Sequence, residues 1–296
     1  MSEVEMKLTG LVTLLIGFFL CWGNGIASER VSVPPTKPSF LTRPVDATIG
    51  KPQTIPAAGA PAVVILHHGG GCLGSQTPQY AKALNAAGYV TLEPCLFTSV
   101  QSRSPSTVTY LPQVFGALRF LAQLPFVDKT RIGITGGSYG GVLSLVSATD
   151  WAYKTHGDQD FPRFAAHAPF YPPCYLVEQF VRAKKGRSDI PGDAYERFGA
   201  SPIRIYAGGN DDYEDRDPKS CESLVEALPP EVRPQITIKL FPEASHGWDH
   251  GNTYSFFERV ACKGKGCTNT NTSDPAVTLE GIRDLTAFFS QSMPAR

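Results

Sequence analysis

Residues 136–141 (GGSYGG) constrain the fold of this chain more than any other segment. They lie between residues 131–135 (RIGIT), an apolar run typical of a short strand, and a helical pattern. A chain that passes straight from strand to helix needs a tight turn, in which side chains flanking the central residue would collide. Gly136 and Gly140 remove those side chains. The sequence therefore predicts a strand–turn–helix unit that lifts Ser138 above a sheet.

The chain after residue 61 alternates short apolar runs with helical patterns. Continuous apolar runs bounded by glycine or proline indicate buried strands, and apolar residues at three- and four-residue steps indicate helices. Their alternation predicts an α/β fold with a mostly parallel central sheet flanked by helices on both faces. The expected strands are residues 62–67, 89–93, 131–135, 164–170, 203–207 and 235–241, and the expected helices are residues 79–87, 110–124, 139–149 and 277–290.

The remaining segments fit a single domain over residues 28–296. A chain of 296 residues with 42% hydrophobic content has enough apolar material for one core. Residues 28–60 are rich in proline, threonine and alanine and are expected to form an extended lead-in, with or without short edge strands. Residues 174–200 carry charge, glycine and proline, and are expected to form a small, partly exposed insertion over the sheet edge.

Residues 1–27 have the pattern of an export signal. Lys7 precedes an apolar run over residues 8–22, and small residues follow, as in a cleaved secretory signal peptide. A helix over that run spans only about 22 Å, less than the roughly 30 Å hydrocarbon core, which disfavours the alternative of an uncleaved anchor. Cys21 follows the bulky Leu20, which disfavours lipidation. We expect a secreted or periplasmic protein with no stable membrane insertion after cleavage.

Six of the 7 cysteines follow residue 27. An even number in an exported chain is typical of disulfides, although six cysteines allow about 15 pairings. Cys262 and Cys267 are close in sequence (CKGKGC), so they form the easiest local closure. The alternative is six buried thiols, which export disfavours.

The charge balance bears on one class of partner. The chain has 27 lysines and arginines and 27 aspartates and glutamates, so its formal net charge is zero. A nucleic-acid-binding protein carries a basic surface that this composition does not supply. We therefore expect no nucleic-acid partner.

A G-x-S-x-G turn between a strand and a helix is the nucleophile elbow of the α/β-hydrolase fold. The alternative is a glycine-rich turn with an incidental serine, but the strand–turn–helix context favours the elbow. Ser138 is therefore the candidate nucleophile. The free amide groups at the start of the helix would face a developing oxyanion, and Tyr139 is the expected donor.

A nucleophilic serine needs a base, and in this fold the acid and then the histidine follow it in the chain. His246 is the candidate base, because it follows the last expected strand in a loop that can reach the strand ends. His167 lies within an apolar strand and is expected to be a core residue. His250 could share a metal with His246, but Gly247 and the lack of an obvious third ligand argue against this site. We expect neither a metal nor a cofactor.

The acid is expected after the strand at residues 203–207, where the chain reads GGNDD. An aspartate there can accept the Nδ1–H of His246 and fix its tautomer. Asp211 is preferred to Asp212 from its spacing after the strand. The alternative is that both aspartates only cap the next helix.

A second oxyanion donor is expected in HHGGGC, the segment that follows the first strand of the predicted sheet. Glycines there let the backbone approach a substrate closely. Gly70 is the chosen donor, and Gly71 remains an open alternative. His68 is expected to support this loop rather than to act directly.

Together these segments resemble the dienelactone hydrolase family. HHGGGC, RIGITGGSYGG, FYPPC, GGNDDY and FPEASHGWD stand in the order that this family shows, and the resemblance covers roughly residues 60–290. It implies that Ser138, Asp211 and His246 occupy the triad positions. The chain departs from the family in its nucleophile, because dienelactone hydrolases proper have a cysteine there. The departure favours general esterase chemistry.

The resemblance also implies a disulfide. Family members with a cysteine in both FYPPC and the segment after the aspartate imply that Cys174 is bridged to Cys221, which would tie the insertion to the acid loop. GGSYGG in addition resembles the elbow of prolyl-oligopeptidase-type peptidases. Those enzymes carry a large additional domain, which we do not expect in 296 residues.

The predicted function is hydrolysis of a small-molecule carboxylic ester through an acyl-enzyme. Two alternatives remain: a small exported peptidase or amidase on the same fold, and a non-catalytic binding protein. The complete set of serine, aspartate and histidine disfavours the binding protein. The fold does not fix the substrate. The aromatic residues expected to bind it are Tyr171, Tyr213 and Trp248, and the alternative is that such residues only pack.

Overall fold

The computed structural model describes residues 28–39, 42–104, 106–183 and 189–294. The expected signal peptide, residues 1–27, lies outside the described residues. Within them, no helix combines the length and the apolar character needed to cross a membrane.

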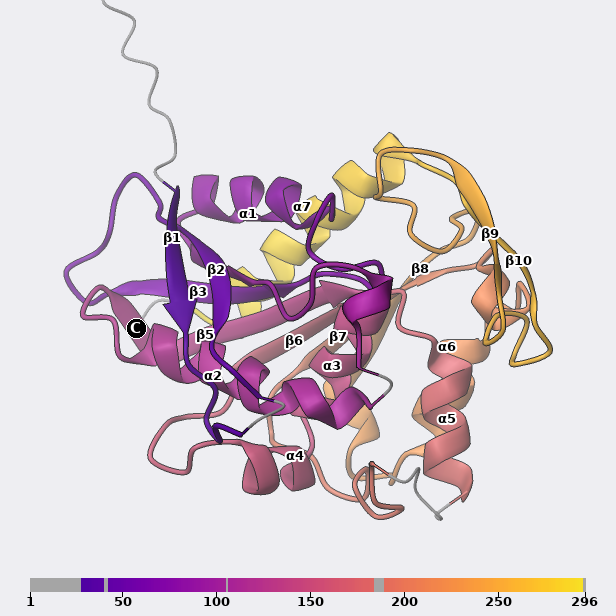
Figure 1. Cartoon of the computed structure of the whole chain (residues 1–296), viewed down its shortest axis with the longest axis horizontal. Coiled ribbons are helices and arrows are strands. Elements are labelled where there is room, and N and C mark those ends of the chain that lie inside the picture. The colour runs from indigo at the N-terminus through magenta and orange to yellow at the C-terminus, as the bar shows by residue number, and fades with distance from the viewer. Residues whose placement is uncertain (1–27, 40–41, 105, 184–188, 295–296) are drawn as a thin grey trace, which may run out of the picture.

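The strands and helices carry the labels of Figure 1. The strands are β1 (Ser28–Val33), β2 (Val45–Gly50), β3 (Ala60–Leu66), β4 (Val90–Pro94), β5 (Val127–Gly137), β6 (Ala166–Phe170), β7 (Ile203–Gly208), β8 (Ile236–Phe241), β9 (Tyr254–Glu258) and β10 (Cys267–Asn271). The α-helices are α1 (Thr77–Ala86), α2 (Leu111–Ala122), α3 (Tyr139–Ser147), α4 (Asp150–His156), α5 (Cys174–Ala183), α6 (Ser220–Ala227) and α7 (Pro275–Ser292). Short 3-10 helices are η1 (Val100–Ser102), η2 (Thr107–Tyr110), η3 (Asp212–Glu214) and η4 (Arg233–Gln235).

The central sheet has 8 strands in the order β1-β2-β4-β3-β5-β6-β7-β8. The six strands from β4 to β8 in this order are parallel to one another. At the other end, β2 pairs antiparallel with β4, and β1 pairs antiparallel with β2. The lead-in segment therefore supplies two edge strands. Figure 1 shows helices on both sides of this twisted sheet, which confirms the predicted α/β architecture.

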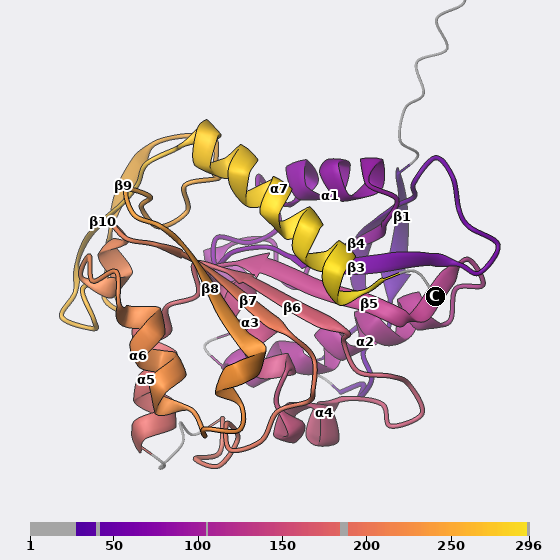
Figure 2. The same ribbon diagram turned by 180° about the vertical axis from the view of Figure 1, so that it is seen from behind.

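Side-chain alternation along the central strands explains the two layers of helices. In β3, Val63 and Ile65 belong to the core under α1 and α7, while Val64 and Leu66 belong to the core under α2 and α3. Successive side chains of a strand point to opposite faces, so a strand covered on both sides is apolar throughout. Figure 2 shows α7 lying across one face of the sheet beside α1.

The expected elements are present with shifted ends, and some elements have no clear sequence signal. β5 begins at Val127 rather than at residue 131. The sequence pattern misses this first part (DKT) because it is largely exposed and shows no apolar run. The sequence patterns do not predict α4, α5, α6 or the antiparallel β9–β10 hairpin. Each of these elements owes its position to tertiary contacts.

Three disulfides join segments that are distant in the sequence or close a local loop. Cys174–Cys221 joins α5 to α6, and Cys262–Cys267 closes the loop between β9 and β10, so both predictions are confirmed. Cys72–Cys95, a pair that the sequence leaves open, joins the loop after β3 to the residue after β4.

The β9–β10 hairpin is docked on the loop that follows β7. The backbone amides of Cys262 and Lys263 donate to the carbonyls of Asp212 (2.7 Å) and Tyr213 (3.0 Å). The carboxylate of Asp212 in turn accepts the amide N–H of Thr270 at 2.8 Å. The hairpin and the β7 loop therefore form one unit at this end of the molecule.

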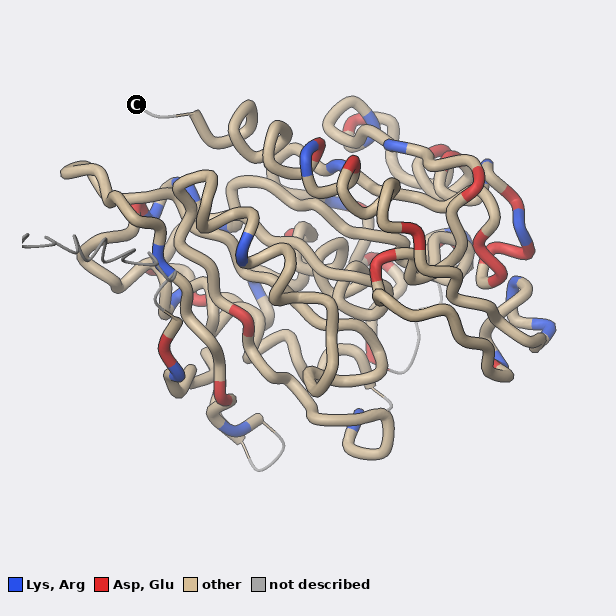
Figure 3. The backbone as a smooth tube through the Cα atoms, turned by 90° about the horizontal axis from the view of Figure 1, so that it is seen from above, with Lys and Arg blue, Asp and Glu red and all other residues tan. Residues whose placement is uncertain are grey.

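Among the described residues, charges of both signs alternate along the backbone in the view of Figure 3. Figure 3 shows lysines and arginines interspersed with aspartates and glutamates along the backbone. The arrangement agrees with the equal numbers of both signs in the sequence.

His167 on β6 makes the stability depend on pH. Its side chain is buried, its Nδ1 lies 2.9 Å from the carbonyl oxygen of Ser144, and burial lowers its pKa from 6.5 to about 4. Between these values the unfolded chain binds more protons than the folded chain, so stability falls as the pH drops from about 6.5 to 4.

His167→Asn keeps a donor near the Nδ1 position but does not titrate. We expect the free energy of unfolding, measured with urea, to fall by on the order of 3 kcal/mol less in this variant than in the unmodified protein as the pH drops from about 6.5 to 4. Equal pH slopes for both proteins would contradict this role.

Candidate active site

Ser138 occupies a strained turn at the carboxyl end of β5. Its backbone φ of 52° lies in the left-handed region that non-glycine residues rarely adopt. A Cβ on Gly136 would lie 2.8 Å from the Cβ of Leu66, and one on Gly140 would lie 2.7 Å from the carbonyl oxygen of His67. Both glycines are therefore required for β3 and α3 to approach the turn, as the motif predicts.

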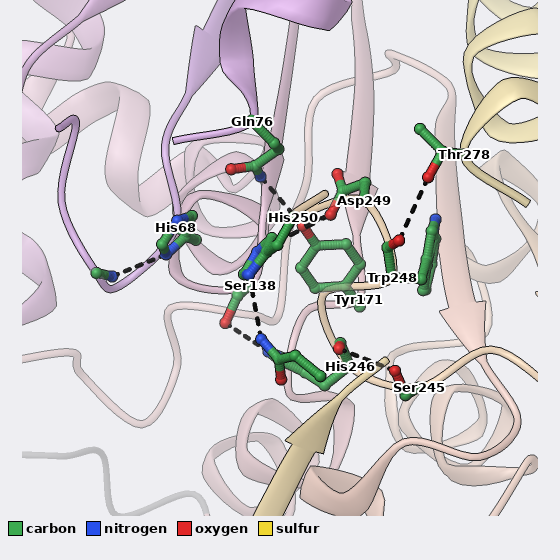
Figure 4. A network of polar contacts seen from close by, with 12 residues as sticks. His68, Gln76, Ser138, Tyr171, Ser245, His246, Trp248, Asp249, His250 and Thr278 are labelled. Carbon is green, nitrogen blue, oxygen red and sulfur yellow. Dashed lines mark hydrogen bonds and ion pairs between the residues drawn. The ribbon is translucent and has the colours of Figure 1, made fainter. Parts of the chain in front are cut away.

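The structure brings Ser138, Asp211 and His246 together in one chain of hydrogen bonds. The Nε2 atom of His246 lies 2.8 Å from the Oγ of Ser138, and its Nδ1 atom lies 2.8 Å from the Oδ2 of Asp211 (Figure 4 shows the serine contact). The carboxylate favours a proton on Nδ1, which leaves Nε2 able to accept the serine proton. All three residues follow parallel strands, whose carboxyl ends share one edge of the sheet.

Neighbouring groups hold this arrangement. The second oxygen of Asp211 accepts the amide N–H of Tyr213 at 2.8 Å. The imidazole of His246 lies between two rings, with centroid distances of 4.1 Å to Tyr213 and 4.9 Å to Tyr171. Asp212, the alternative acid, instead binds the hairpin and does not contact the histidine. The two adjacent aspartates thus have separate partners.

Asp249 holds the histidine loop against its neighbours, and no sequence pattern indicates it. Its buried carboxylate accepts hydrogen bonds of 2.6 Å from the hydroxyls of both Tyr80 and Tyr171. The amide of Gln76 donates to the hydroxyl of Tyr171 at 3.1 Å (Figure 4 shows Gln76, Tyr171 and Asp249). Burial raises the pKa of this carboxyl group. Because Asp249 lies three residues after His246, these bonds fix the histidine loop to α1 and to the residue after β6.

The hydrogen bonds of the glycine loop after β3 show that Gly70 is not the oxyanion donor in this conformation. The amide of Gly70 donates to Nδ1 of His68 at 2.9 Å, and the amide of Gly71 donates to the His68 carbonyl at 3.1 Å. Neither amide can bind an oxyanion in this conformation. Gly69 lies beside the elbow, since a Cβ on it would be 3.7 Å from the Cβ of Tyr139. Within the described residues, the amides of Gly69 and Tyr139 have no hydrogen-bond acceptor.

A cavity of about 410 Å³ opens in front of Ser138 and His246. Tyr213 lines it, as expected. Tyr171 and Trp248 do not, because their side chains are 1% and 0% exposed and pack behind the histidine loop. This corrects their expected role in binding substrate. Both instead contribute to the core around His246.

The wall of the cavity comes from the hairpin rather than from the insertion. Among the described residues, none from the segment 174–200 lines the cavity, whereas β9 contributes four of its five residues. The described part of the insertion therefore does not shape this pocket. The segment begins with α5, which lies beside α6 (Figures 1 and 2), and its described residues 189–200 are not helical.

Arg103 lines the cavity and also lacks a clear sequence signal. One guanidinium nitrogen donates to the carbonyl of Gly69 at 3.3 Å, and the group lies 5.6 Å from the ring centroid of Tyr139. A cation at this place makes the electrostatic potential beside Ser138 more positive.

The solved structures most similar to this one include several esterases. Esterase 2 of Thermogutta terrifontis, phosphorylated by paraoxon, is 17% identical, with a TM-score of 0.62, and the match covers 89% of this chain and 95% of that one. A putative dienelactone hydrolase from Klebsiella pneumoniae is 14% identical, with a TM-score of 0.60 and coverage of 90% and 100%. An esterase from Pyrobaculum calidifontis is 15% identical, with a TM-score of 0.60 and coverage of 91% and 87%.

These likenesses establish that the chain has the α/β-hydrolase fold. At the level of sequence, the Prolyl oligopeptidase family matches residues 103–173, a segment that contains the elbow and most of FYPPC. No curated protein matches the chain. The predicted fold is therefore confirmed, and the likeness of the elbow to prolyl-oligopeptidase-type enzymes recurs in this family match.

Proposed function

We propose that this chain is an exported serine hydrolase that cleaves carboxylic esters through an acyl-enzyme on Ser138. The observation that carries the proposal is the continuous set of hydrogen bonds from Asp211 through His246 to Ser138, at the mouth of a cavity. The esterases among the structural neighbours support the ester as substrate. Three disulfides and the pattern of residues 1–27 support export.

In the proposed reaction, the Oγ of Ser138 attacks the ester carbonyl while the Nε2 of His246 takes the serine proton. Asp211 stabilises the imidazolium that forms. The amides of Tyr139 and Gly69 donate to the oxyanion of the tetrahedral intermediate. The intermediate collapses as His246 returns the proton to the departing alcohol. His246 then activates water, which attacks the acyl-enzyme and releases the acid.

A peptidase or amidase is the second candidate, because the Prolyl oligopeptidase family matches the segment around the elbow. An amide has a poorer leaving group, which must be protonated as it departs. The relative turnover of an ester and an amide therefore distinguishes the two activities. We expect the protein to hydrolyse a short-chain aryl ester much faster than a chromogenic peptide anilide.

Labelling tests the proposed nucleophile directly. A fluorophosphonate probe is expected to modify folded protein at Ser138, located by mass spectrometry of the digested protein, and to leave heat-denatured protein unmodified. The probe needs an activated serine, so it reports the hydrogen bond to His246. Absence of labelling in folded protein would favour a non-catalytic binding protein on the same fold.

A further inference from the structure

Four aromatic rings form a row along one wall of the cavity. His68 stacks on His250 at a centroid distance of 4.3 Å with 29° between the ring planes. Tyr254 follows at 6.0 Å and 16°, and Phe256 follows Tyr254 at 5.9 Å and 23°. All four side chains line the cavity that holds Ser138. We call this row the ring wall.

The alternation of β9 explains how the hairpin supplies its part of the row. Tyr254 and Phe256 are two residues apart on a strand, so they point to the same side, and Glu258 continues that side. Phe257 points to the opposite side and is 68% exposed at the rim. The strand therefore contributes two rings to the row, while Phe257 lines the rim of the cavity outside the row.

Hydrogen bonds hold the row in place. The hydroxyl of Tyr254 lies 2.7 Å from Nδ1 of His250 and accepts from the side-chain amide of Asn271 at 3.0 Å. Burial lowers the pKa of His68 to about 4 and that of His250 to about 3. Both imidazoles are therefore neutral at pH 7, and the row is an uncharged surface.

We propose that the ring wall selects esters that carry a planar aromatic group on their acyl or alcohol side. The proposal rests on the proposed function and names a substrate class for the same site. Planar rings stack or pack edge to face on other rings, and this gain exceeds that from buried area alone. A saturated ring of similar size is thicker and has no π face. A row of rings therefore discriminates by planarity as well as by size.

The position of the row relates this preference to the reaction. His68 belongs to the glycine loop and His250 to the histidine loop, so the row begins next to Gly69 and His246. A substrate ring on Tyr254 or Phe256 would lie in the same cavity as the carbonyl presented to Ser138. The cavity volume of about 410 Å³ is within the range of small-molecule sites.

The test compares aromatic esters with saturated esters of the same size. Phenyl acetate and cyclohexyl acetate vary the alcohol side, and methyl benzoate and methyl cyclohexanecarboxylate vary the acyl side. For each ester, kcat/KM of Phe256→Leu is divided by that of the unmodified protein. We expect this ratio to be about 3- to 10-fold lower for the aromatic member of at least one pair. The affected pair identifies the side that contacts the row.

Control variants separate the ring from general damage. Phe256→Tyr keeps a ring and is expected to keep the aromatic preference. Leu279→Ala, an exposed apolar position on α7 away from the cavity, is expected to leave all four ratios unchanged. If Phe256→Leu does not fold, Tyr254→Leu judged against Tyr254→Phe makes the same comparison at the second ring.

Equal losses for the aromatic and saturated members of both pairs would overturn the ring wall and leave the proposed hydrolase intact. Failure of the unmodified protein to hydrolyse any ester, together with an unlabelled Ser138, would overturn the proposed function first and the ring wall with it.

Discussion

Ser138→Ala is expected to reduce kcat/KM for a short-chain aryl ester by about 10⁴- to 10⁶-fold. The hydroxyl is the atom that would form the acyl-enzyme, and within the described residues no other hydroxyl lies within hydrogen-bond distance of the Nε2 of His246. The residual rate would come from the oxyanion amides and from binding. Initial rates over a range of ester concentrations measure the change.

The same substitution is expected to leave the melting temperature nearly unchanged. Alanine removes one oxygen, keeps the Cβ, and has the same difficulty as serine at a positive φ. Thermal unfolding followed by circular dichroism provides this control. A variant with a large loss of stability and retained hydrolysis would show that Ser138 is a structural residue.

Asp211→Asn is expected to lower kcat by about 10³- to 10⁴-fold. The asparagine amide can present its N–H₂ to the Nδ1 of His246, which would favour the tautomer with the proton on Nε2. That tautomer cannot accept the proton of Ser138. The loss should appear mainly in kcat, since Asp211 is buried and does not line the cavity.

Asp212→Asn is the matched control, because it makes the same chemical change at the next residue. An asparagine oxygen can still accept the amide of Thr270, and the hydrogen bonds of His246 are untouched. We expect less than about a tenfold change in kcat. A larger loss from this variant than from Asp211→Asn would reverse the roles of the two aspartates.

The sequence predicts the parts of the site that depend on local pattern and chain order. The elbow can be predicted from the sequence because the close approach of the backbone around Ser138 requires Gly136 and Gly140. His246 is readable because the parallel sheet orders the loops at one edge, so the residue after the last strand must lie there.

The hairpin escapes prediction because its second strand is polar. β10 reads CTNTN, which shows no apolar alternation, yet Asn269 and Asn271 are buried and share a hydrogen bond of 2.5 Å. Burial of these amides depends on partners outside the strand, such as the Nδ1 of His250 and the hydroxyl of Tyr254. A single sequence does not contain that information.

The errors within the site have a similar origin. Trp248 lies two residues from His246 in the chain, but the loop turns its indole into the core against Phe241. Gly70 is the middle of three glycines, and only the orientation of the His68 ring shows that its amide is already bound. Proximity in sequence places the loop and leaves the direction of each group undetermined.

The attachment of the β9–β10 hairpin leaves the side chains that it presents to the cavity free to vary. Main-chain atoms of residues 212–213 and 262–263 hold the hairpin, and a disulfide closes its tip. Such anchorage is indifferent to the side chains at positions 256 and 257. Under the proposed function, variation at those two cavity-lining positions would change which esters are accepted at little expense in folding, so one scaffold could support homologues with the same chemistry and different substrates.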